Sequence, residues 1–193
     1  MSELVNKVEI EVVAMNNGWQ SILLKLDETG IGFLASYVGD TPLSSLITLA
    51  AEIDIDIEDE EVPCKRHKEW YQEPGTLQII LECDGTVDEI TIKKTNESIW
   101  EDDQGVIEVK DPYETYHFKV KHEAFKNAVI AEAIRILKEY GIRGYNENWN
   151  DGPDNFPVAA FLQLLGNKAN YDEDSETSTS SLVEEVNLLK SIL

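Results

Sequence analysis

The sequence predicts an α+β fold, with an antiparallel sheet of about six strands, two or three main helices packed on it, and a C-terminal helix. Several short segments alternate apolar and polar residues, as half-buried strands do. Turn dipeptides join neighbouring segments of this kind, which indicates hairpins. Elsewhere, apolar residues recur at helical spacing. An antiparallel sheet covered by helices follows from these three observations.

The first expected elements are three strands in an antiparallel meander. Residues 8–12 alternate valine or isoleucine with glutamate, which is the pattern of a half-buried strand. Turn signals at residues 16–18 and 28–30 separate this strand from two further ones, residues 19–26 and 31–38.

A helix is expected next, because Thr41 can cap it and Pro42 fits its first turn. Apolar residues follow at helical spacing over residues 43–53. The alternation of isoleucine with acids over residues 53–57 then predicts a strand with one buried face and one acidic face. Residues 62–75 are expected to be irregular.

The middle of the chain predicts a hairpin. Residues 76–83 and 87–94 flank an Asp-Gly dipeptide at residues 84–85, which is a strong turn signal. Cys83 alternates with the apolar residues of its strand, so it is expected to point into the core as a small apolar residue. A last strand is expected at residues 116–121.

The clearest helix of the sequence covers residues 125–140. Its apolar residues have a spacing of 3.6, and Gly141 follows at the position that ends such a helix. Glu132, Arg135 and Glu139 fall together on its polar side, as an amphipathic helix requires.

A shorter helix is expected after it, capped by Asp154 or Asn155, with Pro157 early in it and Gly166 at its end. The partner surface of the terminal helix is either the same chain or another copy. The chain thus divides into a single α+β domain, an acidic flexible linker and a C-terminal helix, at residues 1–170, 171–181 and 182–193.

The net charge of −22, from 38 acids against 16 bases, argues against a nucleic-acid backbone and an anionic membrane as partners. It favours a cationic protein, although acidic charge also serves solubility alone. No apolar run approaches the ~20 residues of a membrane span, and no signal peptide is expected. We therefore expect a cytoplasmic protein, bacterial in style, whose two cysteines are thiols.

The acids Asp54, Asp56 and Glu58 have the spacing of a calcium loop, but the rest of that pattern is missing. The loop needs Gly at its sixth position and Glu at its twelfth. This chain has Asp59 and Lys65 there. A specific calcium site is not predicted.

Zinc binding and catalysis receive little support from the sequence. Cys64 with His67, and His117 with His122, are compatible with zinc spacing, but the separation between the two halves is unusual. No nucleophile elbow or phosphate loop is present. No metal, cofactor or catalytic residue is predicted, and an enzyme without a readable motif stays an alternative.

Seven carboxylates stand in ten residues at 52–61, which favours an acidic partner-facing strand, although a solvated edge strand explains them too. The loop 145–156 combines aromatic, amide and carboxylate groups and suits a binding surface, with Trp149 in the core as the alternative. Basic residues 65–68 are expected to pair with neighbouring acids such as 58–61. The expected partner-binding residues are Asp54, Asp56, Glu58, Asp59, Glu60, Trp100, Asp102, Asp103, Tyr145, Trp149, Asp151 and Asp154.

With its acidic segments 52–61 and 97–114 and its aromatic loop 145–156, the chain resembles, in a general way, bacterial immunity proteins of polymorphic-toxin and contact-dependent inhibition systems. Those are small, cytoplasmic, often very acidic α+β proteins that occlude a basic toxin, frequently a nuclease. The resemblance covers size, charge and architecture, and no family residue is carried over. It implies an acidic inhibitor that occludes a cationic protein. A structural or self-assembling protein that forms a homodimer is the alternative.

Overall fold

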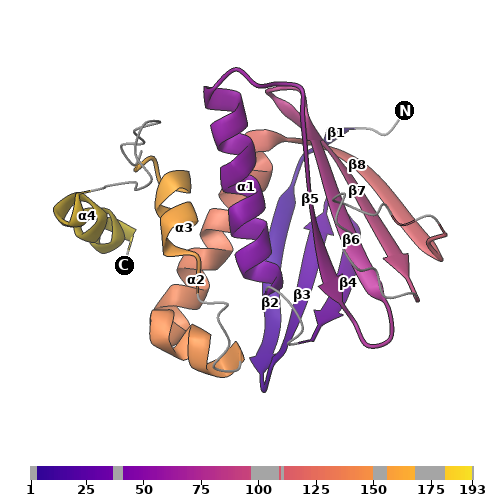
Figure 1. Cartoon of the computed structure of the whole chain (residues 1–193), viewed down its shortest axis with the longest axis horizontal. Coiled ribbons are helices and arrows are strands. Elements are labelled where there is room, and N and C mark those ends of the chain that lie inside the picture. Colours follow the sequence, from indigo (N-terminus) through magenta and orange to yellow (C-terminus); the bar gives the residue numbers. More distant parts are fainter. Residues whose placement is uncertain are drawn as a thin grey trace, which may run out of the picture.

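The computed structural model describes residues 4–36, 41–96, 109, 111–149, 156–167 and 181–192. Within these residues, eight strands form two sheets and four helices lie beside them, which confirms the expected α+β class. Figure 1 shows the helices gathered on one side of the larger sheet, with the C-terminal helix outermost. None of the described helices is long and apolar enough to cross a membrane.

The larger sheet is antiparallel except for the pairing of its first two strands, which is parallel. In spatial order its strands are β1 (Leu4–Val5), β8 (Glu114–Lys121), β7 (Val87–Thr95), β6 (Thr76–Cys83) and β5 (Cys64–Tyr71). The smaller sheet is the expected antiparallel meander. It consists of β2 (Val8–Asn16), β3 (Trp19–Leu26) and β4 (Thr29–Ala35).

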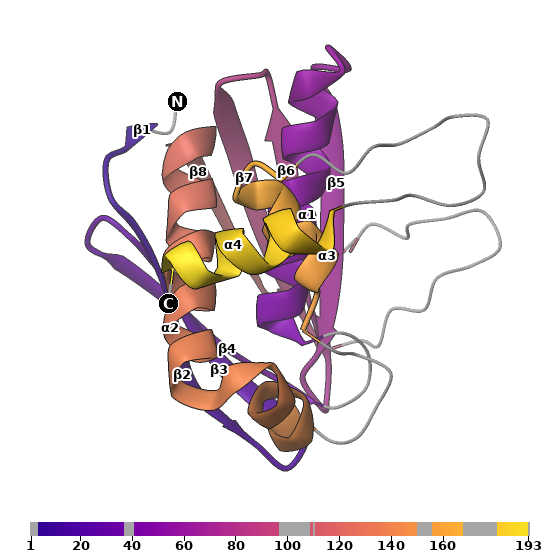
Figure 2. The ribbon, with the colours of Figure 1, turned by 90° about the vertical axis from the view of Figure 1, so that its left-hand side faces the viewer.

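The four helices are α1 (Pro42–Glu58), α2 (His122–Trp149), α3 (Val158–Leu164) and α4 (Leu182–Ile192). Gly141 breaks the regular geometry of α2 with φ 67° and ψ 173°, but a second helical segment continues to Trp149 instead of ending at the glycine. α3 is followed by Gly166 at φ 87°, as expected. Its N-cap is Pro157, whereas the expected caps Asp154 and Asn155 lie outside the described residues. α4 packs beside α3 (Figure 2).

The two sheets and α1 share one hydrophobic core. The Thr41 side chain accepts a hydrogen bond from the Ser44 backbone N–H at 3.0 Å, so α1 begins with the expected cap. Phe33 of β4 stacks on Trp70 of β5 with 4.9 Å between ring centroids. Cys83 is 1% exposed and belongs to the same core, which confirms its expected position.

The strand expected at residues 53–57 is wrong, because α1 continues through this segment to Glu58. Ile53 and Ile57 are four residues apart, so they lie on one face of a helix as readily as on one face of a strand. Ile53 is buried and Ile57 packs against the core, while Ile55 is 43% exposed. Three isoleucines are too few to distinguish the 3.6-residue period of a helix from the two-residue period of a strand.

Residues 64–71 form β5 and not the irregular segment expected there. Charged residues dominate this strand, and such residues have low strand propensity. Pairing with β6 along all eight residues, from Cys64 opposite Cys83 to Tyr71 opposite Thr76, stabilises the strand instead. The count of about six strands rises to eight because β1 and β5 were not expected.

Glu132 was expected on the polar side of its helix, but only 5% of it is exposed. The Val12 backbone N–H of edge strand β2 donates to Glu132 Oε1 at 2.5 Å, and Arg135 donates to the Val12 carbonyl at 2.9 Å. α2 thereby satisfies backbone groups of β2 beside the register shift between Val12 and Ala14.

Candidate functional site

Three chemically reactive side chains meet where the larger sheet passes into α2. Cys83 of β6 lies directly opposite Asp88 of β7, and Asp88 lies opposite Val120 of β8. Residues opposite each other share a face of the sheet, and so do residues two apart along the chain. His122, the first residue of α2, therefore projects on the same side as Asp88. We call Cys83, Asp88 and His122 the core cluster.

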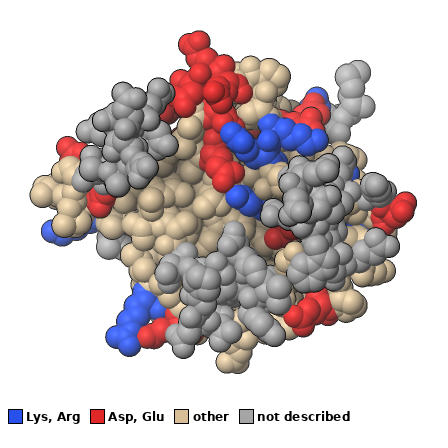
Figure 3. Space-filling model, viewed as in Figure 1, with Lys and Arg blue, Asp and Glu red and all other residues tan. Residues whose placement is uncertain are grey.

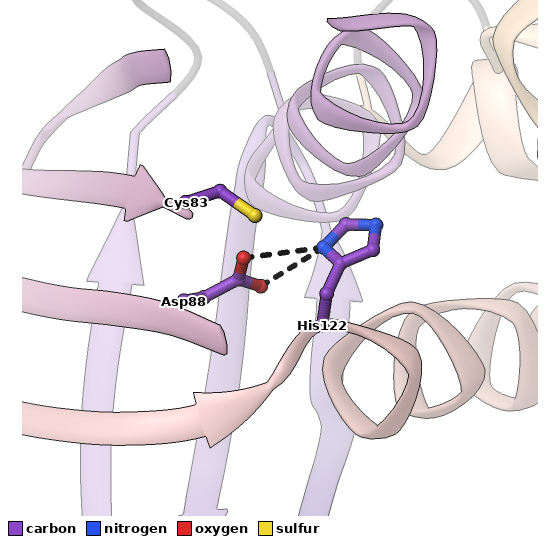
Figure 4. A group of neighbouring side chains, drawn as sticks. All are labelled: Cys83, Asp88 and His122. Carbon is purple, nitrogen blue, oxygen red and sulfur yellow. Dashed lines mark hydrogen bonds and ion pairs between the residues drawn. The ribbon is translucent and has the colours of Figure 1, made fainter. Parts of the chain in front are cut away.

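The core cluster is compact (Figure 4), and all three of its residues are buried. Its sulfur, nitrogen and oxygen atoms all lie within 4.8 Å of one another. His122 Nδ1 is 3.0 and 3.2 Å from the two oxygens of Asp88. Exposure is 1% for Cys83, 0% for Asp88 and 3% for His122. Solvent therefore contributes little to the electrostatics of these groups.

Two further charged groups flank the core cluster. Asp54 of α1 places Oδ1 3.7 Å from His122 Nε2, which is too long for a hydrogen bond but close enough for charge attraction. Lys126 of α2 donates to both oxygens of Asp54 at 2.8 and 2.9 Å. Two carboxylates thus face one imidazolium and one ammonium, so the buried charges balance.

The protonation states follow from this arrangement. Burial by itself lowers the pKa of His122, but the nearby carboxylate of Asp54 and the hydrogen-bonded carboxylate of Asp88 outweigh it and raise the pKa to about 9. Burial raises the pKa of Asp54, yet His122 and Lys126 hold it below its usual range. Burial, together with Asp88, raises the pKa of the Cys83 thiol to about 12. A buried thiol with such a pKa is a poor nucleophile, so cysteine catalysis is not supported.

Acids of α1 bind the basic strand β5. Asp56, 4% exposed, accepts two hydrogen bonds from Arg66, from Nε at 2.8 Å and from a terminal guanidinium nitrogen. Glu52 accepts from Lys68 at 3.0 Å. The basic segment therefore pairs with neighbouring acids, but its partners here are Glu52 and Asp56 rather than acids 59–61 of the expected segment 58–61. Asp54 and Asp56, both expected to contact a partner, are engaged inside the fold.

Four acidic residues at the C-terminal end of α1 are exposed: Glu58, Asp59, Glu60 and Glu61, which we call the acidic helix end. Figure 3 shows acidic side chains gathered over this end of α1. The Glu61 N–H donates to the Asp56 carbonyl at 2.8 Å, and Glu60 has φ 60°. This is the geometry of a Schellman cap, in which glycine usually occupies the position that Glu60 takes here.

Among the other expected partner-binding residues, the structure describes only the side chain of Tyr145. Tyr145 is 0% exposed, and its hydroxyl hydrogen-bonds to Thr41 and Ser44, so it belongs to the core and offers no partner surface. Trp149 is the last residue of α2, and its side chain is not among the described features. Trp100, Asp102, Asp103, Asp151 and Asp154 lie outside the described residues.

Asp88 was missed from the sequence, although the expected hairpin carried a signal for it. In the structure the tip of this hairpin is at Gly85 and Thr86, so residues 83 and 88 lie opposite each other and share a face of the sheet. His122 had no such local signal, because it reaches Asp88 only through the pairing of β7 with β8.

Comparison with protein-family models, curated proteins and solved structures gives no significant match. The molecule is an α+β protein with two sheets, a buried core cluster and an acidic helix end.

Proposed function

We propose that this protein binds a cationic protein through the acidic helix end and inhibits it by covering a basic surface, in the manner of the bacterial immunity proteins that it resembles. The observation that carries this proposal is the position of Glu58 to Glu61 at the C-terminus of a 17-residue helix. These acids are exposed, so a partner can contact them without disturbing the buried core.

The acids stand where helix electrostatics disfavour them. A helix C-terminus carries about half a negative charge, and each acid placed there costs roughly 0.3–1 kcal/mol. The last turn of α1 contains no basic residue. Within the described ranges, the side chains of Asp59, Glu60 and Glu61 take part in no hydrogen bond or ion pair. A cationic partner would offset the unfavourable interaction between these acids and the helix C-terminus. Part of the binding free energy would therefore come from removing an electrostatic strain that is present in the free protein.

The backbone of Glu60 supports the same interpretation. A left-handed conformation costs an L-residue other than glycine roughly 1–2 kcal/mol. Glu60 adopts it at φ 60° while adding a carboxylate. Folding stability therefore does not explain why an acid occupies this position, whereas a contact with a cationic partner does.

The net charge of −22 extends the attraction beyond the acidic helix end. Complementary charge speeds association and makes it sensitive to salt, since exposed charges are screened within about 8–10 Å at moderate ionic strength. We expect the partner to be strongly basic, and a toxin or nuclease is the class that the resemblance suggests.

The test compares two triple variants of equal charge. Asp59→Lys, Glu60→Lys and Glu61→Lys reverse the acidic helix end. Glu28→Lys, Asp111→Lys and Glu184→Lys reverse three exposed acids elsewhere. Affinity capture from native lysate at low and moderate salt, with wild type and both variants, identifies the proteins retained.

At low salt we expect wild type to retain a basic protein. The variant with the three exposed acids reversed elsewhere should retain it as well, whereas the variant with the acidic helix end reversed should not. The association rate of that protein, measured after its purification, should fall with salt for wild type. Equal retention by both variants would contradict the assigned surface. The absence of any basic partner at either salt would contradict the function.

Self-assembly is a second candidate, because α4 presents an apolar face to solvent. Leu182 is 71% and Val183 70% exposed, whereas Leu189 and Ile192 pack against the core. α4 is thus apolar on two sides, and the outer side suits a second copy of the chain.

A further inference from the structure

We propose that Cys83, Asp88 and His122 form a three-ligand binding site for zinc or a similar divalent transition-metal ion. Thiolate sulfur, imidazole nitrogen and carboxylate oxygen are the ligand types of protein zinc sites. A thiolate disfavours calcium and magnesium, which select oxygen ligands.

Only small side-chain movements are needed to bring the three ligand atoms to the distances of a zinc site. In a tetrahedral zinc site, bond lengths of about 2.0–2.3 Å place ligand atoms about 3.3–3.7 Å apart. The three ligand atoms here already lie within 4.8 Å of one another. The backbone positions are set by paired strands, with Cys83 opposite Asp88 in an antiparallel register, so rotation of side chains suffices.

A carboxylate also stands at the position that a zinc-bound histidine requires. A histidine that binds metal through one ring nitrogen usually donates its other N–H to a carboxylate or carbonyl. His122 turns Nδ1 toward Asp88 and Cys83, as Figure 4 shows, and Nε2 toward Asp54 Oδ1 at 3.7 Å. Nε2 is buried and makes no hydrogen bond to any described residue. Lys126 holds Asp54 in place at 2.8 Å.

The balance of charge is preserved when an ion binds. The ion displaces one proton from the Cys83 thiol and one from the His122 imidazolium, and both protons pass to solvent. A divalent cation replaces the two charges that these protons carried, so the surroundings, Asp54, Asp88 and Lys126, stay balanced. The net charge of the buried groups is therefore unchanged by the exchange.

The core cluster is closed to solvent in this structure, with exposures of 1% for Cys83, 0% for Asp88 and 3% for His122. The surface cavity beside Cys83 is lined mainly by side chains of the opposite face of the sheet, among them Glu82, Glu89 and Lys119. An ion therefore enters the core cluster through local opening of the fold.

The probe for the experiment is Co²⁺, which shows a sulfur-to-metal charge-transfer band when a thiolate binds it. Chelator-treated protein is titrated with Co²⁺ in excess Mg²⁺, which occupies the surface carboxylates. We expect one Co²⁺ per chain, a charge-transfer band, and displacement of Co²⁺ by Zn²⁺.

Matched variants assign the ligands. Cys83→Ser should abolish the charge-transfer band, whereas Cys64→Ser, which removes the neighbouring thiol on β5, should keep it. Asp54→Asn should keep the band but weaken Co²⁺ binding by about 10–100-fold, as loss of an outer carboxylate does. His117→Gln, which replaces an exposed histidine, should change neither the charge-transfer band nor the affinity for Co²⁺.

Three results would overturn the proposal: no charge-transfer band in wild type, a band that survives Cys83→Ser, or a band lost with Cys64→Ser. Circular dichroism checks that each variant is folded. If Cys83→Ser does not fold, the wild-type protein provides the test. Its Tm should rise when Zn²⁺ is added and return to the metal-free value when a chelator removes the ion. A Tm that Zn²⁺ leaves unchanged would also overturn the site.

Discussion

Lys126 and Asp54 join the two longest helices of the described structure. Lys126 Nζ of α2 donates to both carboxylate oxygens of Asp54 on α1, at 2.8 and 2.9 Å. The side chains are 17% and 13% exposed, so water screens the pair only in part. Because Asp54 also faces His122, the same contact orders the core cluster.

Removing Lys126 should therefore destabilise the protein. Lys126→Met leaves the Asp54 carboxylate poorly solvated and short of one cation, which should lower the free energy of unfolding by about 1–3 kcal/mol. Urea denaturation measures this loss. The matched control is Lys25→Met, which breaks the exposed pair with Glu11 at 2.9 Å and should cost much less, because water screens that pair. Equal losses in the two variants would show that burial adds nothing to the Asp54 pair.

The stability of the chelator-treated protein should fall as pH rises from neutral to alkaline. The pKa of His122 is raised from 6.5 to about 9 in the folded protein. A raised pKa means that the charged imidazolium contributes its full stabilisation below pH 6.5, and that this contribution is lost as pH passes through 9. The loss should be on the order of 2 kcal/mol.

The groups that face His122 in the described structure are Asp54 on α1, Asp88 on β7 and Cys83 on β6, and Lys126 on α2 pairs with Asp54. Urea denaturation between pH 6 and pH 9.5 gives the profile. His122→Gln should flatten it, while His117→Gln should leave it as in wild type. An equally steep profile in His122→Gln would assign the effect to another group.

Replacing Glu60 by glycine should stabilise the protein. Glycine adopts φ 60° without steric cost, and the change removes a carboxylate from the C-terminus of α1. We expect a gain of about 1 kcal/mol in the free energy of unfolding. Glu61→Gly is the control, because it removes a charge without relieving a left-handed backbone, and its gain should be smaller. A destabilised Glu60→Gly variant would contradict the Schellman interpretation.

The self-assembly candidate predicts a dimeric mass for wild type in light scattering. Leu182→Glu combined with Val183→Glu should then reduce it to the mass of one chain, 21.8 kDa. Val13→Glu introduces the same kind of charge at a site that is 59% exposed on β2 and should leave the dimer intact. A wild-type mass of one chain would refute this candidate.

Much of the fold was predictable because short-range patterns specify it. Thr41 and Pro42 mark the start of α1, and the Asp-Gly turn specifies the β6–β7 hairpin, as the structure confirms. The acidic helix end was also visible as a run of carboxylates, although it was expected on a strand. The sequence pattern did not show which residue each charged side chain pairs with.

The sequence by itself determined the class of fold, the burial of Cys83 and the large negative charge, since each depends on composition or on neighbours a few residues apart. Only the tertiary structure decided which acids are exposed. Asp54 and Asp56 turn inward because α2 and β5 place Lys126 and Arg66 against α1. The core cluster likewise depends on the packing of three elements, because the polar side chains of Asp88 and His122 are stable in the interior only beside each other.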